Sequence, residues 1–371
     1  MNSRFKVVMA AVAVTLSTGL LEAQVSGCSS PATRHASKRT ADRLATAVDR
    51  YADSIAATGL SGVLLVGVGD SVRAERGFGA ANRDRCIAIS SSTLIDIGSI
   101  AKTFTAIGIA RLIEQGRIRE TGPLSRFFQN VPDDKSTITV RQLLTHTSGL
   151  QSFHDTAGDF EVMSRNEAIR RIFSDSLKFA PGTKESYSNS GYTLLAMIGE
   201  NVTGLGWQQY LRDSVFRRAG LRDTWFWSES GMPHDRVALG YLGLDARGDP
   251  SKWPLTWASV GGAGIVMSAR DLFRFSRAIE KGVLVSAAMD KAMQEHPLKK
   301  WAEGWEVSET PYGKLVMKGG ASEFGFTSQL RRYVDRDVTV ILLLNTRRND
   351  KDYPHVEVGP GLSDVVFSSL R

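Results

Sequence analysis

Cysteine is scarce in this 371-residue sequence, in which Cys28 and Cys86 are the only two. Two cysteines exclude a disulfide framework and a cysteine-based metal site, and they allow at most one Cys28–Cys86 bridge. We interpret Cys86 as a small buried hydrophobic side chain. The six histidines show neither H-E-x-x-H nor another short spacing of metal ligands. The sequence therefore predicts no metal site.

Several motifs of cofactor-binding and hydrolytic proteins are also missing. Residues 77–82 fail to complete G-x-G-x-x-G, there is no P-loop, and G-x-S-x-G does not occur. We expect no cofactor, and we interpret His146 as a buried hydrogen-bonding residue rather than part of a Ser-His-Asp triad. The formal charge of +7 comes from basic residues that are interleaved with acidic ones. Because no basic stripe forms, we expect no nucleic-acid partner.

The apolar run near the N-terminus is short for a bilayer span. Residues 7–21 carry no charge, number about fifteen and follow Arg4 and Lys6, which is typical of an export signal. We therefore expect an exported protein of the periplasm or cell envelope.

The end of this signal has two interpretations. Cleavage after Ala23 would remove residues 1–23. Residues 25–28 (VSGC) resemble the bacterial lipoprotein box, and processing there would remove residues 1–27 and attach lipid to Cys28. The second interpretation adds a membrane anchor to the protein.

One domain is predicted for residues 40–371, after a polar tether of residues 24–39. Alternating apolar residues predict antiparallel hairpins near its two ends, over residues 61–78 and 327–344. Helical spacing of apolar residues predicts helices over residues 41–57, 103–114, 140–144, 165–173, 192–202, 207–219 and 269–280. Terminal strands with helices between them favour an α+β fold in two lobes. These are an α/β lobe of about residues 40–120 and 259–371 and a mostly helical lobe of about residues 121–258.

A serine and a lysine stand three positions apart at the head of an apolar helical segment, IGSIAKTF. Ser99 and Lys102 would share one helix face, which brings the lysine amine toward the serine hydroxyl. The apolar residues that follow imply burial, and burial favours the uncharged amine, a usable base. The alternative is a helix cap at Ser99 and a solvated Lys102. The same spacing occurs at Ser3–Lys6, so this motif alone is weak.

Two further motifs each occur once in the chain. Tyr187-Ser188-Asn189 is Y-x-N, in which a tyrosine near lysines can relay protons and an amide can orient a lysine or a carbonyl. Lys318-Gly319-Gly320 is K-x-G, in which glycines let a substrate lie along a strand and the ammonium attracts a carboxylate or supports a phenolate. Taken singly, the first also fits a polar turn with Asn189 or Ser190 as helix cap. The second also fits a glycine-containing strand start.

In the order S-x-x-K, Y-x-N, K-x-G, these motifs resemble those of the serine β-lactamase and penicillin-binding-protein superfamily. The similar branch contains class C β-lactamases, D,D-peptidases and β-lactamase-like esterases. Residues 141–150 (RQLLTHTSGL) and 261–272 (GGAGIVMSARDL) are similar to further signatures of this branch. The resemblance covers about residues 60–345. It implies a β-lactamase/transpeptidase-like fold, with an antiparallel sheet flanked by helices and a mostly helical lobe.

The resemblance also implies a role for each motif residue. Ser99 is expected to be the acylated nucleophile, and Lys102 and Tyr187 to share its proton transfer. Asn189 and the three residues Lys318, Gly319 and Gly320 are expected to bind substrate.

The backbone amides of Ser99 and Ala321 would form the oxyanion hole. Two positions depart from the pattern: Gly319 replaces the threonine, and Ser188 the alanine, that many β-lactamases of this branch carry. Gly319 lacks a hydroxyl that could bind a substrate carboxylate, which puts efficient β-lactam turnover in doubt.

The predicted function is an exported serine hydrolase that acts through an acyl-enzyme on small-molecule ester, peptide or β-lactam carbonyls. The alternative is a catalytically silent penicillin-binding or sensor-type module. Four tryptophans precede Gly261 and either line an acyl pocket or pack in the core, namely Trp225, Trp227, Trp253 and Trp257.

Overall fold

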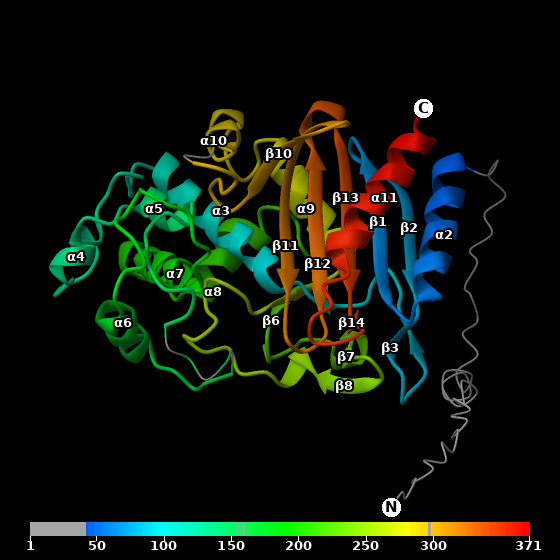
Figure 1. Cartoon of the computed structure of the whole chain (residues 1–371), viewed down its shortest axis with the longest axis horizontal. Coiled ribbons are helices and arrows are strands. Elements are labelled where there is room, and N and C mark those ends of the chain that lie inside the picture. Colours follow the sequence, from blue (N-terminus) through cyan, green and yellow to red (C-terminus); the bar gives the residue numbers. More distant parts are fainter. Residues whose placement is uncertain (1–41, 155, 157, 159, 296–297) are drawn as a thin grey trace, which may run out of the picture. The chain divides into compact units, whose positions relative to one another are not determined.

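The computed structural model describes residues 42–371, apart from residues 155, 157, 159, 296 and 297 (Figure 1). The predicted export signal, the tether and Cys28 lie outside these residues. The helices are α2 (Arg43–Ala56), α3 (Ala101–Glu114), α4 (Asp133–Ser136), α5 (Val140–Leu144), α6 (Arg165–Ser174), α7 (Asn189–Thr203), α8 (Trp207–Leu211), α9 (Ala269–Glu280), α10 (Ala287–Ala292) and α11 (His355–Ser369). The strands are β1 (Gly62–Val68), β2 (Ser71–Phe78), β3 (Ala80–Asn82), β4 (Ile87–Ala88), β5 (Ile95–Asp96), β6 (Thr224–Phe226), β7 (Gly240–Leu242), β8 (Asp245–Gly248), β9 (Ile265–Met267), β10 (Glu306–Thr310), β11 (Gly313–Ala321), β12 (Thr327–Tyr333), β13 (Val338–Leu344) and β14 (Thr346–Arg347).

A six-stranded antiparallel sheet, in the order β10-β11-β12-β13-β1-β2, contains both predicted hairpins. β1 pairs with β13 in a register that runs from Gly62 opposite Leu344 to Val68 opposite Val338. The strands near the two ends of the domain therefore share one sheet. Both strands are almost entirely apolar because neither of their faces is left to water.

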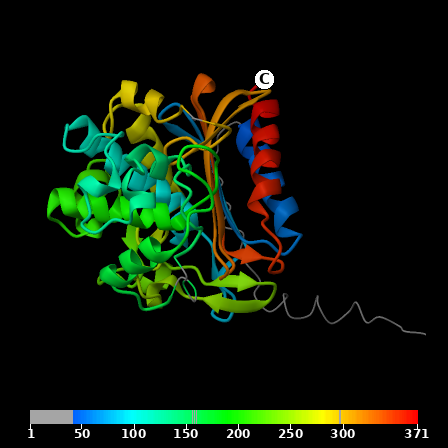
Figure 2. The ribbon, with the colours of Figure 1, turned by 60° about the vertical axis from the view of Figure 1, so that its left-hand side comes forward.

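Helices cover the two faces of this sheet (Figure 2). On one face α2 and α11 pack against side chains such as Leu64 and Val340. On the other face Val63 and Leu343 join a larger core that includes α3, α7 and α9. Alternate residues of each central strand therefore belong to different cores, as the two-residue period of a strand requires. The α+β fold with an antiparallel sheet flanked by helices is confirmed.

The chain between β5 and β9 is mainly helical and carries the short strands β6, β7 and β8. The predicted helix 207–219 is shorter, because α8 ends at Leu211 and continues only as a π-helical turn over Arg212–Phe216. The interpretation of Cys86 was wrong. This residue is exposed in the turn between β3 and β4, where its φ is 51°, so it contributes nothing to a core. The lobe boundaries stay a prediction.

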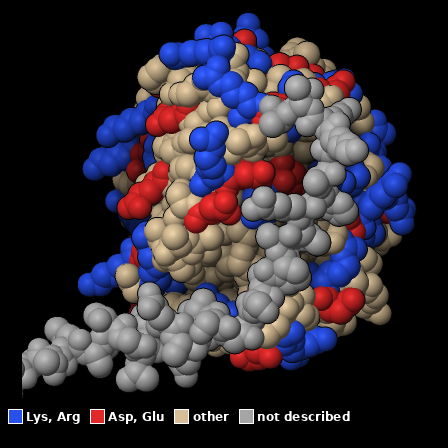
Figure 3. Space-filling model, turned by 90° about the vertical axis from the view of Figure 1, so that its right-hand side faces the viewer, with Lys and Arg blue, Asp and Glu red and all other residues tan. Residues whose placement is uncertain are grey.

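Basic and acidic side chains are interleaved on the face seen in Figure 3. Ion pairs such as Arg73–Asp42 and Arg76–Asp53 join strand β2 to α2 and its cap. Among the described residues, the helices are all too short or too polar to traverse a bilayer.

Candidate active site

Ser99 lies in a short 3-10 turn, η1 (Gly98–Ile100), that leads directly into α3. The residue before it, Gly98, has φ +50°, and a β-carbon there would stand 2.9 Å from the Ala321 amide nitrogen. On β11, a β-carbon on Gly320 would stand 2.1 Å from the Ile97 carbonyl oxygen and 2.9 Å from the Ser99 amide nitrogen. Two glycines thus allow the backbone at Ser99 to lie against the end of β11. The two residues expected to form the oxyanion hole, Ser99 and Ala321, are therefore brought together.

A side chain from β12 stabilises the contact between the backbone near Ser99 and the end of β11. Ser328 on β12 donates a hydrogen bond from Oγ to the carbonyl of Ile97 at 2.8 Å, across 231 positions of sequence. Both groups are buried, so the bond is shielded from competing water.

The amine and the phenol predicted to act on Ser99 both reach its hydroxyl. Lys102 Nζ lies 3.1 Å from Ser99 Oγ and donates to the Gly262 carbonyl at 2.9 Å. Tyr187 Oη donates to Ser99 Oγ at 2.7 Å. Lys102 is fully buried and Ser99 makes no capping bond to α3. The alternative of a capping serine beside a solvated lysine is therefore wrong.

Asn189 begins α7, and its side chain, like that of Lys102, lies beside the backbone of Gly262. A β-carbon on Gly262 would lie 3.1 Å from Lys102 Nζ and 3.4 Å from Asn189 Oδ1. The cap of α7 is Ser188, whose Oγ accepts from the Gly191 amide at 3.0 Å and donates to the Gln151 carbonyl at 2.7 Å. Ser188 thus takes the capping role considered for Asn189 or Ser190, which leaves the Asn189 amide available to the site.

Lys318, on β11, also lies near the Tyr187 ring. Its Nζ lies 5.1 Å from the centroid of the Tyr187 ring, and the side chain is buried. Burial lowers the pKa of Lys318 to about 8; Lys300 lowers the pKa further, and Glu306 opposes the change. The predicted residues of all three motifs therefore converge on one place.

Sequence reasoning missed Trp301, although four residues of the site contact its indole. Lys318 Nζ and Lys300 Nζ lie 4.6 Å and 4.5 Å from the ring centroid. The rings of Tyr187 and His146 lie 5.4 Å and 4.9 Å away. Trp301 therefore packs over the phenol and the ammonium together. An isolated tryptophan before β10 belongs to no motif, so no sequence pattern pointed to it.

His146 contacts the Tyr187 ring and the backbone of Ser188. Its Nδ1 accepts a hydrogen bond from the Ser188 amide at 3.1 Å, and its ring lies 4.5 Å from the Tyr187 ring. Burial, followed by the charges of Lys318, Lys102 and Lys300, holds its pKa well below the usual range. A neutral imidazole that accepts a backbone bond confirms the predicted buried hydrogen-bonding role.

Glu303 is a second residue that sequence reasoning missed. Its side chain is 2% exposed, and Oε2 has no hydrogen-bond partner among the described residues. Burial, followed by the charge of Glu120, raises the pKa of Glu303 to about 8, although Arg141 Nε lies 4.0 Å from Oε1. The folded protein therefore keeps this carboxyl protonated at neutral pH.

We expect the stability of the protein to fall between about pH 4 and pH 8 because of Glu303. In the unfolded chain its pKa returns to about 4.3, so the folded state binds one proton more across this interval. The free energy of unfolding should decrease by on the order of 4 kcal/mol as pH rises through it. Denaturant unfolding of the natural protein and of Glu303→Gln at about pH 5 and pH 8 measures this decrease. The amide of the variant does not titrate, so the contribution of Glu303 to the pH dependence should be lost.

Glu309→Gln, at an exposed position of β10, is the matched control for this substitution. In this variant the free energy of unfolding should depend on pH as it does in the natural protein. If Glu303→Gln shows the same pH slope as the natural protein, Glu303 is ionised in the folded state and its assignment fails.

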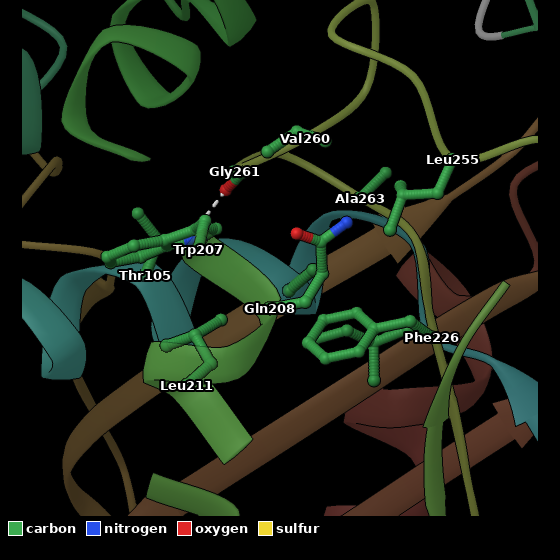
Figure 4. Close-up of a pocket in the computed structure, with 11 residues that line it drawn as sticks. Thr105, Trp207, Gln208, Leu211, Phe226, Leu255, Val260, Gly261 and Ala263 are labelled. Carbon is green, nitrogen blue, oxygen red and sulfur yellow. Dashed lines mark hydrogen bonds between the residues drawn. The ribbon is translucent and has the colours of Figure 1, made fainter. Parts of the chain in front are cut away.

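Two hollows in the described part of the chain are lined by residues other than the predicted site residues. A cavity of about 10 Å³ lies beside Gly261 and Thr105, and the Thr105 hydroxyl donates to the Gly261 carbonyl at 2.8 Å. Figure 4 shows the residues that line it. This volume holds about one water molecule and no substrate. A hollow of about 760 Å³ runs between the β3–β4 turn and β8, lined by Asn82, Arg85 and Arg247 among others. None of the predicted site residues lines either hollow.

The four tryptophans before Gly261 divide between core and surface. Trp227 and Trp253 are buried, and their rings lie 5.0 Å apart. Trp227 Nε1 also donates to Asp96 Oδ1 at 3.0 Å. These two tryptophans therefore pack in the core, while Trp225 and Trp257 are half-buried against it.

Metal ligands do not gather in the part of the chain that the structure describes: no three His, Cys, Asp or Glu side chains stand close enough to hold an ion.

A profile of the family described as Beta-lactamase matches residues 44–357, which is most of the chain. The chain belongs to the beta-lactamase family. A penicillin-binding protein of Bacillus subtilis (strain 168) is 26% identical over 317 residues, covering 79% of this chain and 69% of that one. Penicillin-binding protein 4 of Amycolatopsis lactamdurans is 28% identical over 258 residues, covering 64% of this chain and 66% of that one.

Solved structures of the beta-lactamase fold superpose on this family member along nearly their whole length. A D-amino acid amidase from Ochrobactrum anthropi SV3 gives a TM-score of 0.78 at 23% identity, covering 88% of this chain and 98% of that one. A beta-lactamase/D-alanine carboxypeptidase from Pseudomonas syringae gives 0.73 at 20% identity, with the same coverage. These structures show the fold. Membership of the beta-lactamase family supports serine hydrolase-like activity.

Proposed function

We propose that this protein is a serine hydrolase that forms an acyl-enzyme at Ser99 with ester or amide carbonyls. The observation that carries the proposal is the position of Ser99 Oγ, which lies 2.7 Å from Tyr187 Oη and 3.1 Å from Lys102 Nζ. A hydroxyl held between a phenol and a buried amine has a path for its proton, which a nucleophilic serine requires.

The reaction that this geometry supports has two halves. Ser99 Oγ attacks the carbonyl carbon while its proton passes to the Lys102–Tyr187 pair, and the amides of Ser99 and Ala321 hold the developing oxyanion. The carbonyl carbon then loses the alcohol or amine, which takes up the proton, and an ester to Ser99 remains. Water adds to this ester by the same route, restoring the Ser99 hydroxyl and releasing the acid.

The end of β11 offers the substrate an edge to lie on. Glu306, the first residue of β10, pairs with Met317, whereas Lys318–Ala321 pair with β12. A substrate can therefore extend the sheet beside Lys318, Gly319 and Gly320, with the Asn189 amide facing it across the serine. Esters, D-amino-acid amides or peptides, and β-lactams all present a carbonyl that suits this edge. The names of the relatives, which include penicillin-binding proteins, a D-amino acid amidase and a D-alanine carboxypeptidase, are consistent with this range.

Export belongs to the same proposal. The uncharged run of residues 7–21 after Arg4 and Lys6 supports secretion to the periplasm or cell envelope, where such peptide substrates occur. Residues 25–28 support lipid attachment at Cys28 as the alternative to cleavage after Ala23.

The experiment that tests the function is intact-mass analysis after exposure to a fluorophosphonate and to a penicillin, followed by a substrate panel. We expect a single adduct with each reagent, located at Ser99. Nitrocefin, short p-nitrophenyl esters and a D-Ala-D-Ala peptide then separate the three substrate classes by product release. An unmodified mass with both reagents would contradict the proposal.

Replacing Trp301 should change how the acylation rate depends on pH. The alkaline limb of this profile, where the rate falls with rising pH, should move to higher pH. Trp301→Ala admits water to the Lys318 ammonium, so the pKa of Lys318 should rise from about 8 toward its usual value near about 10.4. Because deprotonation of Lys318 removes the positive charge that faces Tyr187, the labelling rate should fall above about pH 8 in the natural protein. In Trp301→Ala, the fall should begin about one pH unit higher or more.

Two further variants make this result specific. Trp301→Phe keeps the lysine covered and should keep the limb near the pH of the natural protein. In Lys318→Met, the fall of the labelling rate above about pH 8 should disappear, which would assign that fall to the titration of Lys318. If the rate falls at the same pH in the alanine and phenylalanine variants, the indole does not control the pKa of Lys318.

A further inference from the structure

Three consecutive backbone carbonyls, those of residues 260–262, each accept a hydrogen bond from a buried side chain of α3 or α7. The bonds are Thr193 Oγ1 to Val260 at 3.2 Å, Thr105 Oγ1 to Gly261 at 2.8 Å and Lys102 Nζ to Gly262 at 2.9 Å. Figure 4 shows the bond from Thr105. Two helices therefore hold this segment, and one of the three donors is the amine that reaches Ser99 Oγ.

The two glycines of this segment allow a close approach but give the backbone little restraint of its own. Gly261 has φ +88°, and a β-carbon there would stand 2.3 Å from the carbonyl oxygen of Tyr192. The same lack of side chains leaves the adjoining peptide planes free to rotate. The amides of Gly262 and Ala263 both donate to the Ser259 carbonyl at 3.0 Å, which shapes the turn from within. The position of the turn relative to α3 depends on the bonds that come from α3 itself.

The hydroxyl of Thr105 supplies one of these bonds instead of bonding within its own helix. A threonine in a helix can donate to a carbonyl three or four residues earlier, as Thr103 does to Ile100 at 2.8 Å. Thr105 donates to Gly261, which is 156 positions away. Because Thr105 follows Lys102 by three residues, the two side chains share one face of α3, and their acceptors are adjacent carbonyls. Thr105 therefore fixes the distance between α3 and the segment that Lys102 binds.

We propose that Thr105 is a positioning residue for the proton transfer at Ser99, and that it acts through the Gly262 carbonyl on the amine of Lys102. Without the hydroxyl, the glycine segment can move away from α3. The Lys102 amine, which follows its carbonyl partner, then leaves its place 3.1 Å from Ser99 Oγ. A displacement of about 1 Å between reacting groups can cost about 10²-fold in rate. We assign no substrate contact to Thr105, which is buried, so substrate binding should be kept. This inference rests on the proposed function for the role of Lys102.

Stopped-flow acylation by a fluorescent penicillin tests this role, because it separates the rate constant of acylation from the dissociation constant of the complex that precedes it. In Thr105→Val, which keeps the shape of the side chain, the rate constant should fall by about tenfold to 10²-fold with the dissociation constant unchanged. Thr105→Ala should lose rate in the same way, whereas Thr105→Ser keeps the donor and should restore most of the rate. Thr193→Val is the matched comparison, since it removes the buried bond to Val260. It should lose similar stability in denaturant unfolding and acylate at nearly the rate of the natural protein.

A double-mutant cycle shows whether Thr105 acts through the lysine. In the Lys102→Ala background, Thr105→Val should not slow the remaining labelling further, because the group that Thr105 positions is gone. An equal fold loss in both backgrounds, an equal loss in Thr193→Val, or an unchanged rate in Thr105→Val would each overturn the positioning role. Absence of any adduct on the natural protein, with a penicillin and with a fluorophosphonate, would instead overturn the proposed hydrolase.

Discussion

Ser99→Ala should abolish covalent labelling by fluorophosphonates and penicillins and lower substrate turnover by about 10⁴-fold or more. The hydroxyl is the atom that forms the bond to the acyl group, and neither Lys102 nor Tyr187 can replace it from its observed position. The fold should survive, because Ser99 makes no capping bond to α3 and the adjoining backbone contact relies on glycines. Intact mass, gel fluorescence and product release are the measurements.

Ser92→Ala is the matched control for this change, since Ser92 is exposed and its hydroxyl bonds to Ser90 Oγ within the same turn. It should label and turn over like the natural protein. An adduct that persists in Ser99→Ala would move the nucleophile elsewhere. A natural protein that labels at Ser99 but releases no product from any of the three substrate classes would favour the silent penicillin-binding module.

Lys102→Ala and Tyr187→Phe should each slow acylation by about 10²-fold to 10⁴-fold, the range of a lost acid–base group. Tyr187→Phe is the more specific test of the two. The ring that contacts Trp301 and Lys318 remains, and only the hydroxyl 2.7 Å from Ser99 Oγ is lost. Lys102→Ala also removes a bond to Gly262, so its stability must be measured alongside. Stopped-flow labelling gives the acylation rate directly.

The controls for this pair are Lys314→Ala and Tyr312→Phe, at the beginning of β11 and in the turn before it. Both should acylate at the rate of the natural protein. The two site variants should also be strongly non-additive, since the amine and the phenol act on one proton. Near-normal acylation in Tyr187→Phe would remove the phenol from the proposed reaction.

Much of the candidate site could be predicted because its parts have local patterns. The spacing of Ser99 and Lys102, the Tyr187–Asn189 motif and Lys318–Gly320 are each visible within four residues of sequence. Trp301 and Glu303 follow no such spacing. Their importance arises from the residues of other elements that they meet, for example the indole of Trp301, which packs against both Tyr187 and Lys318. Contacts of this kind are absent from a one-dimensional pattern.

The C-terminal helix shows the same limit for the fold. α11 contains Pro360 between two glycines, a composition that disfavours a helix. The glycines have a tertiary reason. A β-carbon on Gly359 would stand 1.8 Å from Gln329 Oε1, and one on Gly361 would stand 2.4 Å from Tyr51 Oη. Packing against β12 and α2 therefore outweighs local propensity, whereas the amphipathic helix α2 and the strands β1 and β13 carried clear periodicity.

The bond from Ser328 to Ile97 joins segments separated by 231 positions. During synthesis, the hydroxyl, amine and phenol all leave the ribosome well before the strand that completes their surroundings. A nascent or prematurely terminated chain therefore carries these groups without the backbone of β11 that lies against Ser99. We expect the proposed acyl transfer only from a chain that has been made beyond Ser328.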